Sequence, residues 1–80
     1  MSIELLSDGQ KVRARFGRAG AEDVIWGAWK EVTLSVQRNK KGEIAFIGVR
    51  GLAWAEYTPA DYDPQHGFLA EHYYMQIETD

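Results

Sequence analysis

The chain has 80 residues and a mass of 9.1 kDa, which leaves room for one small hydrophobic core and a single domain over residues 1–80. Apolar residues make up 45% of the sequence and charged residues 26%, values that exclude a disordered tail or a collagen-like repeat. The absence of cysteine excludes disulfides, thiol nucleophiles and thiolate metal sites. No apolar run approaches the roughly 18 residues of a membrane span, and the first residues lack the pattern of a secretory signal, so we expect a cytoplasmic protein.

The charged residues are divided unevenly along the chain. All nine Lys and Arg residues fall within residues 1–50, where six acidic residues leave a net charge of +3. Residues 51–80 contain six acidic residues and no Lys or Arg, which gives a net charge of −6. Surfaces of opposite charge attract over about one Debye length, roughly 8–10 Å at moderate salt, so this polarity affects which partners approach and how they are oriented.

A β-hairpin is predicted at the N-terminus, with strands over residues 3–6 and 11–16. The Asp8-Gly9 pair between two alternating segments is a strong hairpin signal. Alternation along the second strand predicts an inward apolar face and an outward basic row. The inward residues are Val12, Ala14 and Phe16, and the basic row is Lys11, Arg13 and Arg15.

A second hairpin is predicted over residues 31–49. Val32, Leu34 and Val36 alternate with polar residues, Gly42 suits the turn, and the segment 44–49 is apolar on both faces, as in a central strand. The preceding segment, residues 21–31, fits a strand and also has helical spacing. We favour a strand there because strand-forming residues follow Gly27.

The C-terminal part is predicted to add two strands and one helical turn. Residues 52–57 and 71–78 favour strands, and Thr58 followed by Pro59 is typical of a helix start. The predicted fold is therefore mainly β: an antiparallel sheet or half-barrel of five or six strands, with or without one short helix.

Motifs for catalysis and metal binding are missing. The histidines, His66 and His72, match no zinc spacing, and a calcium loop starting at Asp61 fails because His72 stands where a bidentate Glu is needed. Neither Ser2, Ser7 nor Ser35 lies in a Gly-x-Ser-x-Gly elbow. We therefore predict a protein that is not an enzyme and has no metal or cofactor.

The aromatic residues are numerous for a small core, so some are expected at the surface as interface anchors, although filling the core is an equal alternative for each tryptophan. We expect Trp54 and Tyr57 to be partly exposed because acidic residues lie near them. Carboxylates there can replace phosphates against a basic groove of a larger protein or ribonucleoprotein complex. The predicted partner-binding surface consists of Trp54, Glu56, Tyr57, Asp61, Tyr62 and Asp63.

In small size, acidity, absence of cysteine and absence of catalytic motifs, the chain resembles the phage-encoded anti-CRISPR proteins. The resemblance is one of overall profile across the whole chain and transfers no individual residue. It implies an inhibitor that blocks a nucleic-acid-binding surface of a CRISPR surveillance complex.

An alternative hypothesis is a small β-barrel that binds nucleic acid or acts as an adaptor. Basic residues beside strand aromatics suit phosphate contact and base stacking, but the net charge of −3 argues against tight non-specific binding. The same cations also fit the acidic half of a second copy, which would give a homodimer. A structural scaffold protein with no separate activity is a third possibility. The alternative basic surface consists of Lys11, Arg13, Arg15, Arg38, Lys40 and Lys41.

Overall fold

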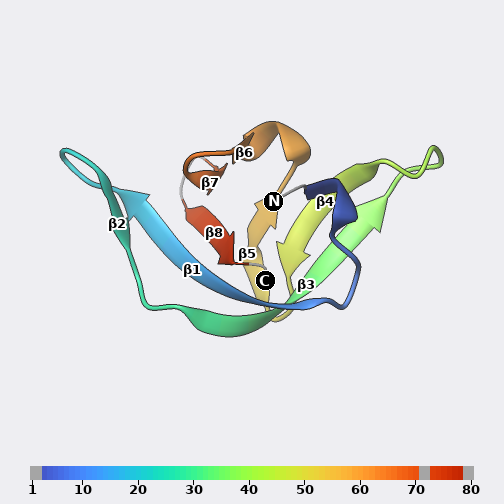
Figure 1. Ribbon diagram of the computed structural model, residues 1–80, viewed down its shortest axis with the longest axis horizontal. Coiled ribbons are helices and arrows are strands. Elements are labelled where there is room, and N and C mark those ends of the chain that lie inside the picture. The colour runs from blue at the N-terminus through green and yellow to red at the C-terminus, as the bar shows by residue number, and fades with distance from the viewer. Residues whose placement is uncertain (1–2, 71–72, 79–80) are drawn as a thin grey trace.

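The chain forms an eight-stranded antiparallel sheet with two short 3-10 turns, seen in a computed structural model that describes residues 3–70 and 73–78 (Figure 1). The antiparallel β class is confirmed, but the expected five or six strands are too few. The strands are β1 (Lys11–Ala19), β2 (Val24–Trp26), β3 (Lys30–Arg38), β4 (Ile44–Val49), β5 (Leu52–Tyr57), β6 (Tyr62–Asp63), β7 (Gly67–Leu69) and β8 (Tyr74–Glu78), and the turns are η1 (Ile3–Leu5) and η2 (Pro59–Asp61). Ser2, Glu71 and His72, which entered the sequence analysis, lie outside the described residues.

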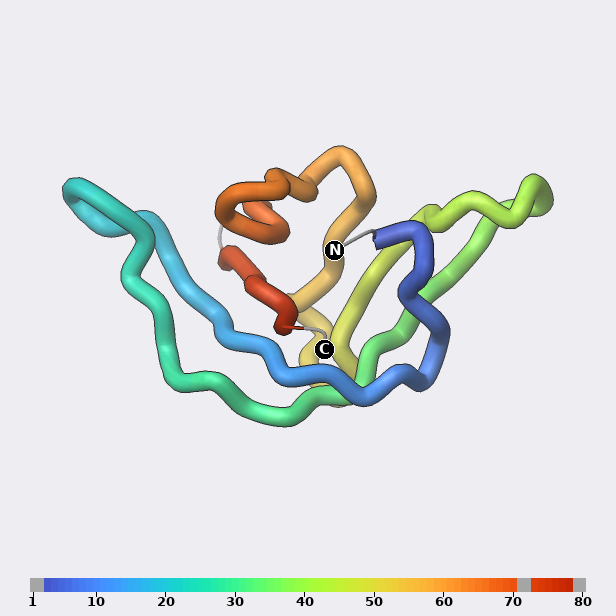
Figure 2. The backbone as a smooth tube through the Cα atoms, in the orientation of Figure 1, coloured from blue at the N-terminus to red at the C-terminus, as the bar shows by residue number. Residues whose placement is uncertain are grey.

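The strand order is β5-β4-β3-β1-β8-β7-β6, and β2 pairs with the far end of β1. The tips of the β1–β2 and β3–β4 hairpins point to opposite ends of the long axis, while β6, β7 and β8 lie between them (Figure 1). The backbone tube shows the same two projecting hairpins, and the molecule measures 40 × 24 × 23 Å (Figure 2). No helix within the described residues is long and apolar enough to cross a membrane.

The additional strands are too short to show an alternating pattern of apolar and polar residues in the sequence. Strands β6 and β7 have two and three residues and pair Tyr62 with Phe68. Within residues 21–31, only residues 24–26 of β2 and residues 30–31 at the start of β3 are strand, and none of the segment is helical. Two residues of β1, between Ala14 and Gly17, stand opposite three residues between Trp26 and Lys30, so a bulge separates β2 from β3.

The predicted strand over residues 3–6 is wrong. These residues begin a 3-10 turn, although the expected turn residue Gly9 does adopt a φ of 82°. Both edges of β1 are already occupied, by β3 on one side and β8 on the other, so no edge is open to a further strand. Leu6 instead inserts into the core, and the Arg38 guanidinium donates to the carbonyls of Glu4 and Leu6.

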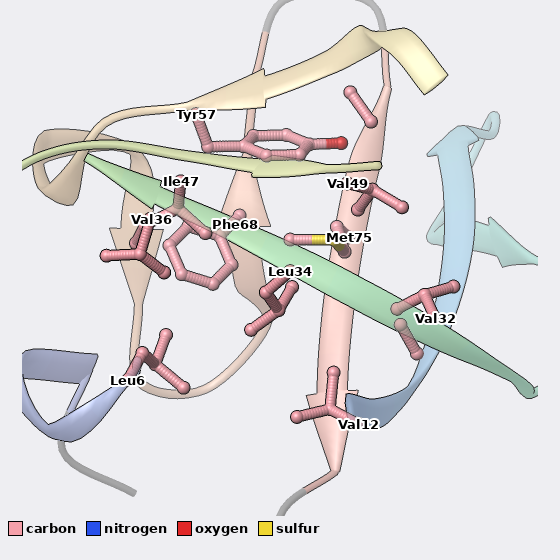
Figure 3. Close-up of a cluster of buried hydrophobic side chains, with 12 residues drawn as sticks. Leu6, Val12, Val32, Leu34, Val36, Ile47, Val49, Tyr57, Phe68 and Met75 are labelled. Carbon is pink, nitrogen blue, oxygen red and sulfur yellow. The ribbon is translucent and has the colours of Figure 1, made fainter. Parts of the chain in front are cut away.

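The core is built from side chains of six strands and the Leu6 segment (Figure 3). The alternation predicted for β3 is confirmed, because Val32, Leu34 and Val36 are all buried. Strand β4 lies between β3 and β5 as expected for a central strand. The helical turn predicted after Thr58 is a 3-10 turn in which the Asp61 N–H donates to the Thr58 carbonyl at 3.0 Å.

Candidate functional site

Tyr57, predicted at the partner-binding surface, is a core residue and only 1% exposed. In β5 it alternates with the exposed Glu56, and its ring centroid lies 5.5 Å from that of Phe68. Figure 3 shows the Tyr57 ring among the buried side chains. The expectation of exposure is wrong because acidic neighbours along a strand do not determine which face a side chain takes; strand alternation does.

The hydroxyl group of Tyr57 is buried without a hydrogen-bond partner among the described residues. Burial raises the pKa of Tyr57 from 10.0 to about 12, and the negative charge of Asp61 adds to this increase. A buried hydroxyl that makes no hydrogen bond lowers stability, which makes Tyr57 a sensitive test position.

Two of the predicted acidic site residues hold turns together. The Asp61 carboxylate accepts from the Thr58 N–H at 2.9 Å, and the Asp63 carboxylate accepts from the Gln65 N–H at 3.0 Å. His66 Nδ1 lies 2.8 Å from the other Asp63 oxygen. The hydrogen bond with His66, followed by that from Gln65, holds the pKa of Asp63 below its usual value. These carboxylates therefore have local structural roles whether or not they also meet a partner.

The basic row divides between ion pairing and stacking on the outer face of β1. Arg13 pairs with Glu78 at 3.2 Å, and Arg15 Nε donates to Gln76 at 2.7 Å. The Arg15 guanidinium lies 4.8 Å from the ring centroid of Trp26 and 4.9 Å from that of Trp29, while Arg13 lies 5.8 Å from Trp29. We call this group, Arg13, Arg15, Trp26 and Trp29, the outer ladder.

The remaining predicted cations belong to another part of the molecule. Lys11 stands opposite Thr33, and Arg38 lies five residues further along β3, about 17 Å away in an extended strand. Arg38 also donates to the carbonyls of Glu4, Leu6 and Gly42, so it is committed to the fold. Lys40 and Lys41 lie in the exposed turn that follows. The six predicted cations therefore do not form one basic surface.

An aromatic hollow lies on the opposite face of β1 from the outer ladder. The ring of Trp54 meets Phe16 edge-on at a centroid distance of 5.2 Å and lies 4.7 Å from the ring of Tyr73. The hollow is lined by Phe16, Gly17, Arg18, Ile25, Trp54 and Tyr73. Three of these side chains are large, apolar and about half exposed: Ile25 at 55%, Trp54 at 48% and Tyr73 at 47%.

A bulge in β5 accounts for the placement of Trp54. Val49 pairs with Leu52, and the preceding residue Gly48 pairs with Glu56, so residues 53–55 have no partner opposite them on β4. A bulge bends its strand and redirects side chains, and Trp54 sits at the centre of this one. Sequence alternation would place Trp54 beside Glu56, whereas the structure joins it to β1 and to the residue before β8.

Two cations flank the hollow. Lys30 Nζ lies 5.1 Å from the centroid of the Phe16 ring, and Arg18 forms part of the lining. The hollow measures about 210 Å³, below the roughly 300 Å³ at which small-molecule pockets usually begin. It has the size to hold one large side chain of a partner rather than a whole metabolite.

Sequence reasoning identified Trp54 but missed its partners in the hollow. Phe16 was expected in the core, and Ile25 and Tyr73 were not predicted as site residues. Their half-exposed apolar character is visible only in the structure, because the irregular pairing that collects them has no sequence signature. Among the residues that the structure describes, no three His, Asp or Glu side chains gather in a metal-binding arrangement.

Comparisons with known proteins place no further constraint on this surface. The chain matches no protein-family model, no curated protein and no solved structure. The aromatic hollow and the outer ladder are therefore interpreted from their chemistry alone.

Proposed function

We propose that this chain is a non-enzymatic binding protein that covers a surface of a larger protein or ribonucleoprotein complex. The observation that supports this proposal is the aromatic hollow, where Ile25, Trp54 and Tyr73 are half exposed side by side. Large apolar side chains clustered on the surface of a small protein are typical of interaction sites, and Trp and Tyr are the most frequent anchors.

The proposed contact centre differs from the acidic surface expected from the sequence. Tyr57 is buried, and Asp61 and Asp63 stabilise turns, so Trp54 and the exposed Glu56 are the members of that set best placed to meet a partner. The resemblance to anti-CRISPR proteins supplies the first partner class to test, the CRISPR surveillance complexes. In that case the bound protein would prevent the complex from reaching its nucleic-acid target.

The test is inhibition of target-DNA binding by purified surveillance complexes, with Trp54→Ala and Tyr73→Ala as variants. Loss of a central aromatic anchor costs about 2 kcal/mol or more, so each variant should weaken inhibition by over tenfold. Phe46→Ala is the matched control, because Phe46 is also an exposed aromatic residue but lies on β4 outside the hollow. Circular dichroism would verify that all variants are folded. Full inhibition by both hollow variants would contradict the proposal.

A second candidate function, nucleic-acid binding, is favoured by the outer ladder. Arg15 lies against two indole rings, and Arg13 lies near one of them, an arrangement that suits base stacking and phosphate contact. Anisotropy of a labelled twelve-nucleotide oligo-dT tests it: affinity should fall steeply with salt and be lost in Arg15→Gln. Trp54→Ala should bind the oligonucleotide normally under this hypothesis. Oligonucleotide binding that neither salt nor Arg15→Gln weakens would rule it out.

A further inference from the structure

We propose that the aromatic hollow recognises an acidic peptide segment, in which one large apolar side chain is followed or preceded within two residues by Asp or Glu. This inference rests on the proposed function and specifies the chemistry of the partner. It has two parts: an anchor that enters the hollow and a carboxylate that meets the flanking cations.

The anchor follows from the size and lining of the hollow. A volume of about 210 Å³ has room for one side chain, and the walls are the rings of Phe16, Trp54 and Tyr73 together with Ile25. Aromatic rings pair favourably with another ring in edge or offset contact at about 4.5–7 Å between centroids. The inserted side chain is therefore aromatic or a long aliphatic one.

The carboxylate of the peptide is inferred from two cations, one on each side of Phe16 along the direction of β1. Arg18 lies two residues beyond Phe16 on the same face of β1, and Lys30 stands opposite Ala14, two residues before Phe16. Alternate residues of an extended strand are about 6.6 Å apart. A carboxylate two positions from an inserted anchor of an extended peptide thus meets Arg18 or Lys30. Neither cation forms an ion pair with another described side chain.

The same charges favour a peptide over a nucleic acid as the occupant. A strand of nucleic acid presents a phosphate at every residue and is bound by a track of cations. Here two cations flank one hollow, while Arg13 and Arg15 lie on the opposite face of β1 in the outer ladder. The chain also carries a net charge of −3, which repels a polyanion much more strongly than a single carboxylate.

Selection from a displayed library of random twelve-residue peptides tests the inference directly. The immobilised full chain is the target, and Trp54→Ala is used to remove peptides that bind elsewhere. We expect the enriched peptides to share an aromatic or long aliphatic residue with Asp or Glu within two positions. The best peptide, made with a fluorescent label, is then measured against variants by anisotropy.

A charge-swap variant separates recognition of the carboxylate from simple apolar binding. In the Arg18→Glu, Lys30→Glu double variant, the affinity for the acidic peptide should fall by more than tenfold. The same variant should bind a peptide in which Lys replaces the acidic residue. Lys40→Glu with Lys41→Glu is the matched control, since it makes the same change in net charge at the exposed β3–β4 turn. In this control, the ratio of the affinities for the acidic peptide and for the peptide with Lys should stay within about twofold of the wild-type ratio.

Three results would overturn the inference. One is enrichment of peptides that lack an acidic residue near the anchor, and another is a charge-swap variant with unchanged preference. The third is Trp54-dependent binding of the twelve-nucleotide oligo-dT, which would assign the hollow to nucleic acid. The proposed function is judged separately, because Trp54→Ala and Tyr73→Ala can abolish inhibition of a surveillance complex even when no acidic peptide is selected.

Discussion

Replacing Tyr57 by Phe tests whether the buried hydroxyl lowers the stability of the fold. The residue is 1% exposed, packs against Phe68, and has no hydrogen-bond partner for its hydroxyl among the described residues. Tyr57→Phe deletes that single oxygen and keeps the ring in place. Since an unsatisfied buried polar group costs about 1–3 kcal/mol, we expect the variant to be more stable than the wild type by about 1 kcal/mol or more at pH 7.

The difference between the two proteins should grow at alkaline pH. Burial raises the pKa of Tyr57 to about 12, so between pH 10 and pH 12 the unfolded chain loses this proton while the folded chain retains it. Ionisation then stabilises the unfolded state, and the free energy of unfolding falls. The shift from 10.0 to about 12 sets an upper limit of ~2.7 kcal/mol, which is reached only above the pKa of the folded state, so we expect about 1–2 kcal/mol at pH 11.5.

Urea denaturation followed by circular dichroism at pH 7, pH 10 and pH 11.5 measures both effects. Tyr73→Phe is the matched control, because it deletes the same oxygen from a side chain that is 47% exposed, and its stability should stay within about 0.5 kcal/mol of the wild type at pH 7. Subtracting the control removes the titration of the other groups. If Tyr57→Phe were less stable than the wild type by 1 kcal/mol or more, the hydroxyl would have to be satisfied and the reasoning would be refuted.

Three further changes test the core, the outer ladder and the β6–β7 turn. Phe68→Ala, at a fully buried position of β7, should lower the free energy of unfolding by about 3–5 kcal/mol, measured by urea denaturation. Gly17→Ala should destabilise by about 1–3 kcal/mol and shift the tryptophan fluorescence, because the added Cβ would lie 2.7 Å from the Trp26 ring; an unchanged spectrum and stability would contradict this packing. The lowered pKa of Asp63 means that the wild type loses stability as the pH falls below 3.8 and this carboxylate becomes protonated in the folded state. Asp63→Asn should remove that loss and give a flatter profile of melting temperature against pH. An identical profile would show that His66 does not stabilise the carboxylate.

Local patterns in the sequence were sufficient for the regular strands and the turns between them. The alternation of Val32, Leu34 and Val36 predicted the buried face of β3, because a strand buried on one side must alternate. Gly42 marked the β3–β4 turn through its positive φ, and Thr58 with Pro59 marked a helical turn through capping and a fixed φ. These features depend on neighbours along the chain, so they can be predicted without tertiary contacts.

Competition for strand edges and the placement of the aromatic residues were decided only by the tertiary structure. Residues 3–6 have a strand-like sequence, but β3 and β8 already occupy both edges of β1, so the segment becomes a turn. Strand alternation alone puts Trp54 and Tyr57 on opposite faces of β5, but it does not determine that Trp54 meets Phe16 of β1 and Tyr73. The β5 bulge at residues 53–55 accompanies these contacts, and that bulge depends on how β4 and β5 pair, which is a property of two strands together rather than of either sequence alone.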